Sequence, residues 1–257
     1  MASITPTSNI EGTICTGLQA QCNATASTSF SGPPGVGLEL SVGGIAESIT
    51  DRLRALVIKA KVNHKAKILT QSDLKTACIY CKLNTDIKPQ SYGTLIESYI
   101  INKYNVKKNT PSACIGDICI AGTQNYEVKV SLGGIEHNKF NFVQIRMNHV
   151  CDYLLIAYHL SVANVDTNGE LFVFKLTKPE IKPLILKYGG LAHGTTTKKG
   201  VITQESIDMA QNETEYALRP KYGDACWTEL VNSYRISDYE AILKCSTVEG
   251  NQIGSAN

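Results

Sequence analysis

Three residues near the middle of the chain have side chains of the types that can bind a hard divalent cation and support phosphodiester chemistry. Asp117 belongs to an apolar run over residues 115–120, and Glu127 and Lys129 belong to a second run over residues 126–130. Both runs have the composition of β-strands. Side chains alternate between the two faces of a strand, so Glu127 and Lys129 are expected on the same face. Two carboxylates beside a lysine predict a Mg²⁺ site for phosphodiester hydrolysis.

The expected mechanism follows from these residue types. Asp117 and Glu127 would hold the Mg²⁺ ion through carboxylate oxygens. The ion would lower the pKa of a bound water and neutralise charge that develops on the phosphate. Lys129 would orient that water, act as a base or stabilise the pentavalent state. The competing interpretation is an exposed Glu–Lys pair on an edge strand, which contributes little.

A further acid, Glu97, lies upstream among large apolar residues. It is expected either as an outer ligand that reaches the metal through water or orients Lys129, or as a surface glutamate of a helix. A second set of similar composition consists of Asp166, Glu180 and Lys182. This set is set aside because Glu180 and Lys182 follow a proline in a predicted helix, where they would lie on different faces.

The elements that must position these residues follow from the apolar pattern. Helices are predicted over residues 44–64, 72–83 and 91–104, with Ser72 or Thr70 as the N-cap of the second. Strands are predicted over residues 113–120, 124–131, 152–160 and 170–176. Residues 138–149 are expected to form a helix that crosses over between the second and third strands, and a short helix is expected over 179–187. This order predicts an α/β (α+β) fold with a central mixed β-sheet flanked by helices.

The chain is expected to contain one domain between two flexible ends. Residues 1–36 are rich in Ser, Thr, Gly and Ala and carry almost no charge, which predicts a flexible N-terminal arm. Residues 37–250 are expected to form the single domain, with a catalytic core over about residues 91–187. Residues 251–257 are a polar tail.

Nine cysteines are scattered along the chain, mostly inside apolar stretches. This distribution favours reduced, buried thiols and a cytoplasmic location. Cys78 and Cys81 form a lone CxxC pair, which supplies two of the four ligands that structural zinc needs, so core packing is the preferred interpretation. No apolar run approaches the length of a membrane span, and no signal peptide opens the chain, so no membrane partner is expected.

Basic residues concentrate in one part of the chain. Residues 51–110 hold 12 Lys and Arg against 4 Asp and Glu, although the whole chain has a net charge of only +2. A basic block in a nearly neutral protein indicates a polyanionic partner, and the alternative is a solvated helix surface.

The residues Asp117, Glu127 and Lys129 resemble the active-site motif of the PD-(D/E)XK nucleases, and especially of the type II restriction endonucleases. Glu97 would match the helical glutamate that many members carry upstream. Ser131 and the following segment 140–145, read as a Phe/Gln helix, resemble short restriction enzymes that recognise and cut DNA within one small domain. The chain departs from the family pattern at the position of its proline, which is Gly116 here. The resemblance covers residues 97–176 and implies a restriction-endonuclease-like core preceded by N-terminal helices.

Several polar residues are candidates for binding double-stranded DNA. Gln144, Arg146 and Asn148 follow the expected site and have the side chains that read adenine and guanine edges. A glycine-rich segment and a second basic spot could follow the phosphate backbone, with an ordinary solvated loop as the alternative for the first. Their candidate residues are His193, Lys198, Lys199, Arg219 and Lys221.

The sequence and the resemblance together favour a Mg²⁺-dependent, site-specific double-strand DNA endonuclease. A structure-specific or repair nuclease with the same centre is the enzymatic alternative. A non-catalytic nucleic-acid-binding or virion-type structural protein is the other alternative, and the arm at residues 1–36 fits that class equally well. A palindrome cutter needs one active site per strand, so either a homodimer or sequential nicking by a monomer is expected.

Overall fold

The computed structural model describes residues 42–62, 65–110, 114–135, 137–192, 202–209 and 214–244. The expected arm at residues 1–36 and the tail at residues 251–257 lie outside these ranges. Within the described residues, no helix is both long enough and apolar enough to cross a membrane.

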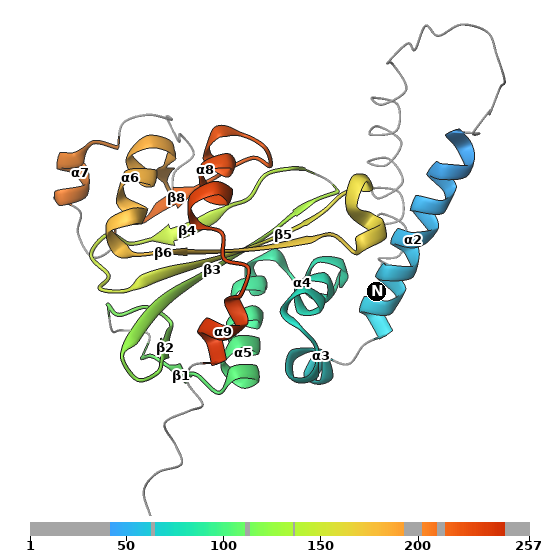
Figure 1. The fold of residues 1–257 in the computed structure, drawn as a ribbon, viewed down its shortest axis with the longest axis horizontal. Helices are drawn as coiled ribbons and strands as arrows, with labels where there is room; N and C mark the ends of the chain where they lie inside the picture. The colour runs from blue at the N-terminus through green and yellow to red at the C-terminus, as the bar shows by residue number, and fades with distance from the viewer. Residues whose placement is uncertain are drawn as a thin grey trace, which may run out of the picture.

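Along the described chain, helices come first, and strands and then further helices follow (Figure 1). The helices are α2 (Val42–Val62), α3 (Lys65–Gln71), α4 (Leu74–Leu83), η1 (Pro89–Ser91), α5 (Tyr92–Tyr104), η2 (Val162–Thr167), α6 (Lys178–Tyr188), α7 (Gln204–Asp208), α8 (Ala225–Tyr234) and α9 (Tyr239–Lys244). The strands are β1 (Lys107–Lys108), β2 (Ile118–Ile120), β3 (Gln124–Gly134), β4 (Phe142–Ile145), β5 (Asp152–Leu160), β6 (Glu170–Leu176), β7 (Gly190–Leu191) and β8 (Tyr216–Leu218).

A five-stranded mixed sheet forms the centre of the molecule, with strand order β1-β2-β3-β5-β6. β3 and β5 pair in parallel, and the other neighbours pair antiparallel. A three-stranded antiparallel sheet, β4-β8-β7, lies beside it. The expectation of an α+β fold with a central mixed sheet flanked by helices is therefore confirmed.

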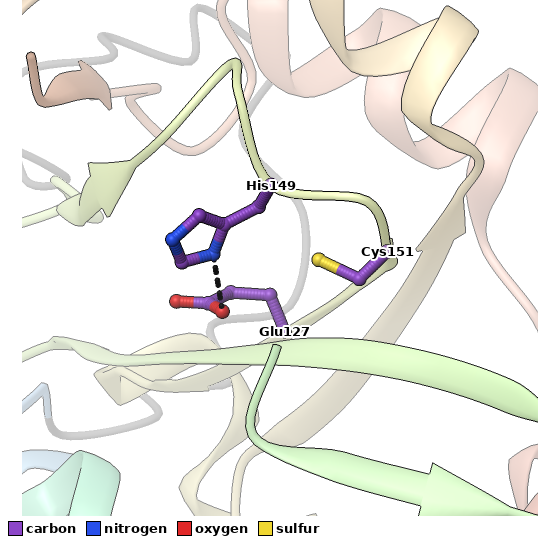
Figure 2. Close-up of side chains that lie close together, drawn as sticks. All are labelled: Glu127, His149 and Cys151. Carbon is purple, nitrogen blue, oxygen red and sulfur yellow. Dashed lines mark hydrogen bonds and ion pairs between the residues drawn. The ribbon is translucent and has the colours of Figure 1, made fainter. Parts of the chain in front are cut away.

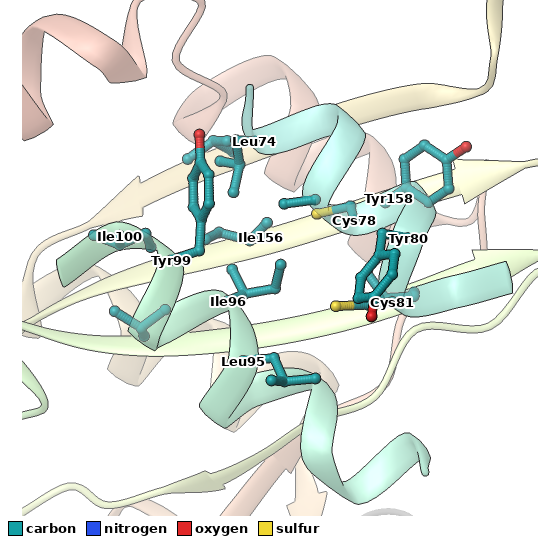
Figure 3. Close-up of a cluster of buried hydrophobic side chains, with 14 of the residues drawn as sticks. Leu74, Cys78, Tyr80, Cys81, Leu95, Ile96, Tyr99, Ile100, Ile156 and Tyr158 are labelled. Carbon is teal, nitrogen blue, oxygen red and sulfur yellow. The ribbon is translucent and has the colours of Figure 1, made fainter. Parts of the chain in front are cut away.

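The central sheet separates two hydrophobic cores. Alternate residues of β5 supply the two sides: Leu154 and Ile156 pack in one core, and Tyr153 and Leu155 pack in the other. The first core is formed with α4 and α5, whose buried side chains meet β5 in Figure 3. The second lies under α6, α8 and the small sheet, around the buried Trp227. Because both faces of β5 are covered, nearly the whole strand is apolar, as expected for a central parallel strand.

The predicted N-terminal helices are present, and one boundary differs. Asp73 caps α4, because its Oδ1 accepts the N–H of Thr76 at 2.6 Å. The prediction that Ser72 or Thr70 caps this helix was therefore wrong. Aspartate is as good an N-cap as serine, and the helix begins at Leu74, two residues later than the predicted range of 72–83.

The predicted crossover helix at residues 138–149 is not present, and this correction also removes the Phe/Gln helix. Residues 142–145 form β4, which pairs with β8. Phe140, Phe142 and Ile145 are fully buried in the second core. Their partner strand lies some seventy residues further along the chain, a long-range pairing that the local pattern could not show.

The short length of β2 leaves one edge of β3 unpaired. β2 has three residues and pairs only with Gln124, Asn125 and Tyr126, whereas β3 continues to Gly134. β5 pairs with the opposite edge of β3 over the range 126–134. The predicted strand over 113–120 is thus confirmed only for residues 118–120. Between Tyr126 and Gly134, whose N–H donates to the His137 carbonyl, this edge of β3 lies open to side chains from other elements.

Candidate active site

Asp117 lies immediately before β2 and is fixed there by its backbone. Its N–H donates to the Tyr126 carbonyl at 2.8 Å, and its carbonyl accepts the N–H of Asn109 at 2.9 Å. Gly116 precedes it with φ +81°, and a Cβ at that position would lie 2.7 Å from the Tyr126 carbonyl. Glycine at this position therefore lets the chain approach β3 closely.

The Asp117 side chain continues the pairing of β3 where β2 has no residue to do so. Its Oδ2 accepts the N–H of Val128 at 2.8 Å. The bond satisfies a backbone donor on the open edge of β3 and holds the carboxylate beside Glu127. Because a carboxylate oxygen has more than one lone pair, the group keeps acceptor capacity for a cation.

Glu127 and Lys129 form a buried pair on β3. The Lys129 Nζ donates to Glu127 Oε1 at 2.6 Å, and the side chains are 13% and 6% exposed. The other carboxylate oxygen, Oε2, lies 3.3 Å from His149 Nδ1. The prediction that Glu127 and Lys129 share a face is confirmed, and the alternative of an exposed surface pair was wrong.

Glu97 projects from α5 toward the same place. Its side chain is 16% exposed and accepts from Lys108 Nζ at 2.9 Å, so its charge partner is Lys108 and not Lys129. The four predicted acid and lysine residues line one cavity of about 280 Å³. The full lining is Glu97, Lys108, Asn109, Gly116, Asp117, Glu127, Lys129, Gln144, Arg146 and His149.

The surroundings of Asp117 in this cavity disfavour its charged form. Burial and the neighbouring Glu127 carboxylate raise the pKa of Asp117 to about 6 from its ordinary value of 3.8. The Val128 N–H and the Lys129 ammonium act in the opposite direction and do not cancel the effect. A carboxylate in such surroundings is stabilised by an added proton or by an added cation.

A larger cavity of about 650 Å³ shares Glu97, Asp117, Lys129 and Gln144 with the first and extends along β3 to Leu132. Ser131 lies on its wall and accepts the N–H of Asn141 at 2.8 Å, which ties β3 to the segment before β4. The volume of this larger cavity is within the range of ligand-binding clefts. The open edge of β3 thus gives access to the acidic residues.

Gln144 contributes to both cavities from an irregularity in β4. The pairing of β4 with β8 shifts register between Phe142 and Ile145, and Gln144 has φ +59°. A bulge of this kind redirects a side chain, here an exposed one that lines both cavities.

The other predicted DNA-binding residues fall into different places. Arg146 lines the smaller cavity and pairs with Glu215. Asn148 lines a separate cavity with Met147 and Lys178, so the structure does not group it with Gln144 and Arg146.

The second basic spot is partly engaged in holding the fold. The Arg219 guanidinium donates to Asn141 Oδ1 and to the carbonyls of Leu191 and Ala192. Lys221 is exposed, and its backbone N–H donates to Asp224 Oδ2. His193, Lys198 and Lys199 lie outside the described residues.

The basic block at residues 51–110 is divided between two regions. Arg52 and Lys75 donate to the carbonyls of Asp166 and Thr167 in η2 at 2.9 and 2.8 Å. Arg54 pairs with Asp51 on the surface of α2. Lys108 reaches the candidate site. Part of the block therefore fastens helices to a turn of the domain.

The alternatives that the sequence analysis set aside are also located. The carboxylate of Glu180 caps α6 through Thr177, and Lys182 pairs with Asp208, so the second acid–lysine set does not assemble. Cys78 and Cys81 are fully buried in the first core, as preferred, and burial raises the pKa of the Cys81 thiol to about 12.

Sequence reasoning missed three residues at this site: Lys108, His149 and Cys151. Glu127, His149 and Cys151 are all buried, and one potential ligand atom from each lies within 4.8 Å of the others. Figure 2 shows the three side chains pointing toward one another. The histidine and cysteine stand two residues apart just before a predicted strand, but only the pairing of that strand with β3 brings them to Glu127.

Comparison of the chain with models of protein families, with curated proteins and with solved structures finds no match. The chemistry that the site can perform follows from its own side chains.

Proposed function

We propose that the protein is a Mg²⁺-dependent, site-specific endonuclease that hydrolyses phosphodiester bonds of double-stranded DNA. One observation carries this proposal: Asp117, Glu127 and Lys129 arrive from different parts of the β2–β3 hairpin and line one cavity with Glu97. Basic and amide side chains, Lys108, Arg146 and Gln144, line the same cavity. This is the combination that a phosphodiester and its counter-ion require.

The acids present fit a Mg²⁺ ion. Asp117 and Glu127 would hold it, since Mg²⁺ prefers carboxylate oxygen and usually keeps several waters. When bound, the ion supplies Lewis-acid stabilisation of the phosphate and lowers the pKa of a water ligand. The raised pKa of Asp117 supports this assignment, because a bound cation would stabilise the charged form of a carboxylate that burial and the Glu127 carboxylate disfavour.

The protein's own groups supply positioning and charge. Lys129 is fixed on the Glu127 carboxylate at 2.6 Å and can orient the attacking water or stabilise the phosphate as its charge grows. Glu97 pairs with the Lys108 ammonium, which lines the cavity and can contact a neighbouring phosphate. The open edge of β3 offers the approach for the DNA strand.

The test is incubation of the purified full-length chain with several unmethylated duplex DNAs and Mg²⁺, with and without a chelator. We expect discrete fragments that require the ion. Lys129→Ala and Asp117→Asn should lower the cleavage rate by at least a hundredfold, because the first removes the ammonium that would orient the water or stabilise the phosphate and the second removes a carboxylate that would hold the ion. Lys182→Ala is the matched control, since this lysine pairs with Asp208 elsewhere and its loss should leave cleavage unchanged.

The outcomes separate the alternatives. Cleavage restricted to junctions or flaps would favour a structure-specific or repair nuclease with the same centre. DNA binding with no cleavage, or cleavage that Lys129→Ala does not change, would contradict the proposal and favour a non-catalytic binding or structural protein. Sedimentation with DNA present would show whether a homodimer or a monomer acts.

A further inference from the structure

Glu127, His149 and Cys151 form a cluster that the proposed phosphodiester chemistry does not use as a unit. All three residues are less than a tenth exposed. Glu127 Oε2 lies 3.3 Å from His149 Nδ1, and the sulfur of Cys151 lies within 4.8 Å of the ligand atoms of both. In Figure 2 the thiol and the imidazole point to the same side as the carboxylate.

The register of β3 and β5 determines this cluster. Glu127 is the register partner of Tyr153, and register partners in neighbouring strands project to the same face of a sheet. Cys151 stands two residues before Tyr153, so it shares that face. The turn that carries His149 is closed by its N–H, which donates to the Arg146 carbonyl at 3.2 Å. The three side chains are therefore held by paired strands and a closed turn.

The spacing and the donor types match a thiophilic cation. Two ligands at about 2.0–2.1 Å from a tetrahedral zinc ion stand roughly 3.3 Å apart. That is the separation observed between Glu127 Oε2 and His149 Nδ1. With a zinc–sulfur distance of about 2.3 Å, a tetrahedral site places the sulfur roughly 3.5 Å from the other ligand atoms, so the Cys151 sulfur needs to approach by at most about 1.3 Å. Thiolate and imidazole favour Zn²⁺ over Mg²⁺, which is held by oxygen donors.

We propose that Glu127, His149 and Cys151 form a Zn²⁺ site that is distinct in chemistry from the carboxylate site of Asp117 and shares Glu127 with it. Three protein ligands leave a fourth position for water. A bound zinc ion removes the proton of a coordinating thiol, so the thiol of Cys151 becomes a full ligand on binding. Occupation of this site engages Glu127 Oε2 and so competes with a metal held together with Asp117, while Oε1 stays bonded to Lys129.

The binding test uses the reduced, metal-free full-length chain, titrated with Zn²⁺ in competition with a chromophoric chelator. We expect the wild type to bind one equivalent of Zn²⁺. The affinity for Zn²⁺ should fall at least tenfold in Cys151→Ser and in His149→Ala, because each variant lacks one ligand. With Co²⁺ in place of Zn²⁺, the wild type should show near-ultraviolet thiolate-to-metal absorption, and Cys151→Ser should lack it.

Two control variants make the result specific. Cys226→Ser removes another buried thiol, in α8. This variant should still bind one equivalent of Zn²⁺ and should still show the thiolate-to-Co²⁺ absorption. Asp117→Asn removes the neighbouring acid and should also keep both the binding and the absorption. Circular dichroism shows whether each variant is folded, and His149→Gln replaces His149→Ala if the alanine variant unfolds. Equal Zn²⁺ affinity in wild type and Cys151→Ser would overturn the proposal.

The zinc site has one consequence for catalysis, inhibition of DNA cleavage by Zn²⁺, which rests on the proposed function. The binding titration is independent of that function. If the chain cleaves DNA with Mg²⁺, low Zn²⁺ should inhibit cleavage by occupying Glu127. Cys151→Ser should then need at least tenfold more Zn²⁺ for the same inhibition. Zn²⁺ binding without nuclease activity would support the zinc site and contradict only the proposed function. Cleavage with unchanged Zn²⁺ sensitivity in Cys151→Ser would contradict the zinc site.

Discussion

At the scale of single residues, Asp117 is a carboxylate whose charged form is held at a cost to stability. Its carboxylate is largely buried near Glu127, and the Val128 N–H and Lys129 only partly compensate the charge. The consequence is a pKa raised to about 6. Sites that concentrate like charge commonly destabilise the folded chain and are relieved by ligand or by substitution.

Replacing Asp117 with asparagine should therefore stabilise the metal-free protein at neutral pH. Because the folded-state pKa is above the unfolded value of 3.8, the folded chain binds more protons between about pH 4 and pH 6, and stability falls as pH rises through that window. Asparagine can still accept the Val128 N–H and has no charge. We expect Asp117→Asn to be more stable by roughly 3 kcal/mol at pH 7 and nearly equal to wild type below pH 4.

The measurement is denaturant unfolding across this pH range with a chelator present. The difference between the two proteins is the relevant quantity, because other carboxylates titrate in both. A difference that stays constant from pH 4 to pH 7 would contradict the assignment of the shift to Asp117. Added Mg²⁺ should stabilise the wild type and leave the asparagine variant nearly unchanged.

At the scale of elements, the β2–β3 hairpin is the unit that brings the acids together. The hairpin turns at Ala121 and Gly122, both with positive φ, and Gly116 closes its open end. Both glycines have left-handed backbone conformations, but only Gly116 is pressed against the opposite strand. Substitutions at Gly122 and Gly116 therefore distinguish the free-energy cost of a left-handed backbone conformation from the additional cost of a steric clash.

Gly116→Ala should destabilise the protein more than Gly122→Ala. At Gly122, with φ +70°, an added Cβ meets nothing within 4 Å, so the expected cost is that of the conformation, about 1 kcal/mol. At Gly116 the Cβ would also lie 2.7 Å from the Tyr126 carbonyl, and the total should reach about 3 kcal/mol. Thermal and denaturant unfolding of the two variants measure the difference.

The two variants should also differ at the site. Displacement of residue 116 moves Asp117, whose Oδ2 accepts the Val128 N–H, so metal-dependent stabilisation should be lost in Gly116→Ala and kept in Gly122→Ala. Equal stabilities and equal metal responses would show that close packing at Gly116 is unimportant.

At the scale of the whole molecule, the basic residues of the block at 51–110 contact two separate regions of the domain. Arg52 of α2 and Lys75 of α4 hold the carbonyls of the η2 turn, which follows β5. Lys108 lies across the domain at the candidate site. The net charge of the block therefore overstates the number of cations that a polyanion would contact there.

The double variant Arg52→Ala with Lys75→Ala should lower the free energy of unfolding by about 2 kcal/mol, because it removes charge-assisted hydrogen bonds that join helices to η2. The matched control is Arg54→Ala with Lys59→Ala. It removes the same charge from exposed positions and should change stability by no more than about 0.5 kcal/mol. Denaturant unfolding at one ionic strength compares them. Equal losses would mean that charge alone, and not the tie to η2, is responsible.

Much of the element pattern was predictable because it is local. Helical periodicity reflects one buried face of a single helix, as at residues 74–83 and 92–104. An apolar run reflects a strand with two buried faces, as at residues 152–160 and 170–176. The grouping of Glu127 with Lys129 was predictable for the same reason, since the alternation of a strand needs no partner. The error at residues 138–149 has the opposite origin, because β4 exists through its pairing with β8.

By itself, the sequence determined the α+β class, the main helices and strands, and the shared face of Glu127 and Lys129. Only the tertiary structure decided which other groups meet them. The three-residue length of β2 opens the edge of β3, and the β3–β5 register brings Cys151 and His149 to Glu127. The physical reason is that periodicity reports the environment of one element, whereas a site depends on register and on strand ends between elements distant in the chain.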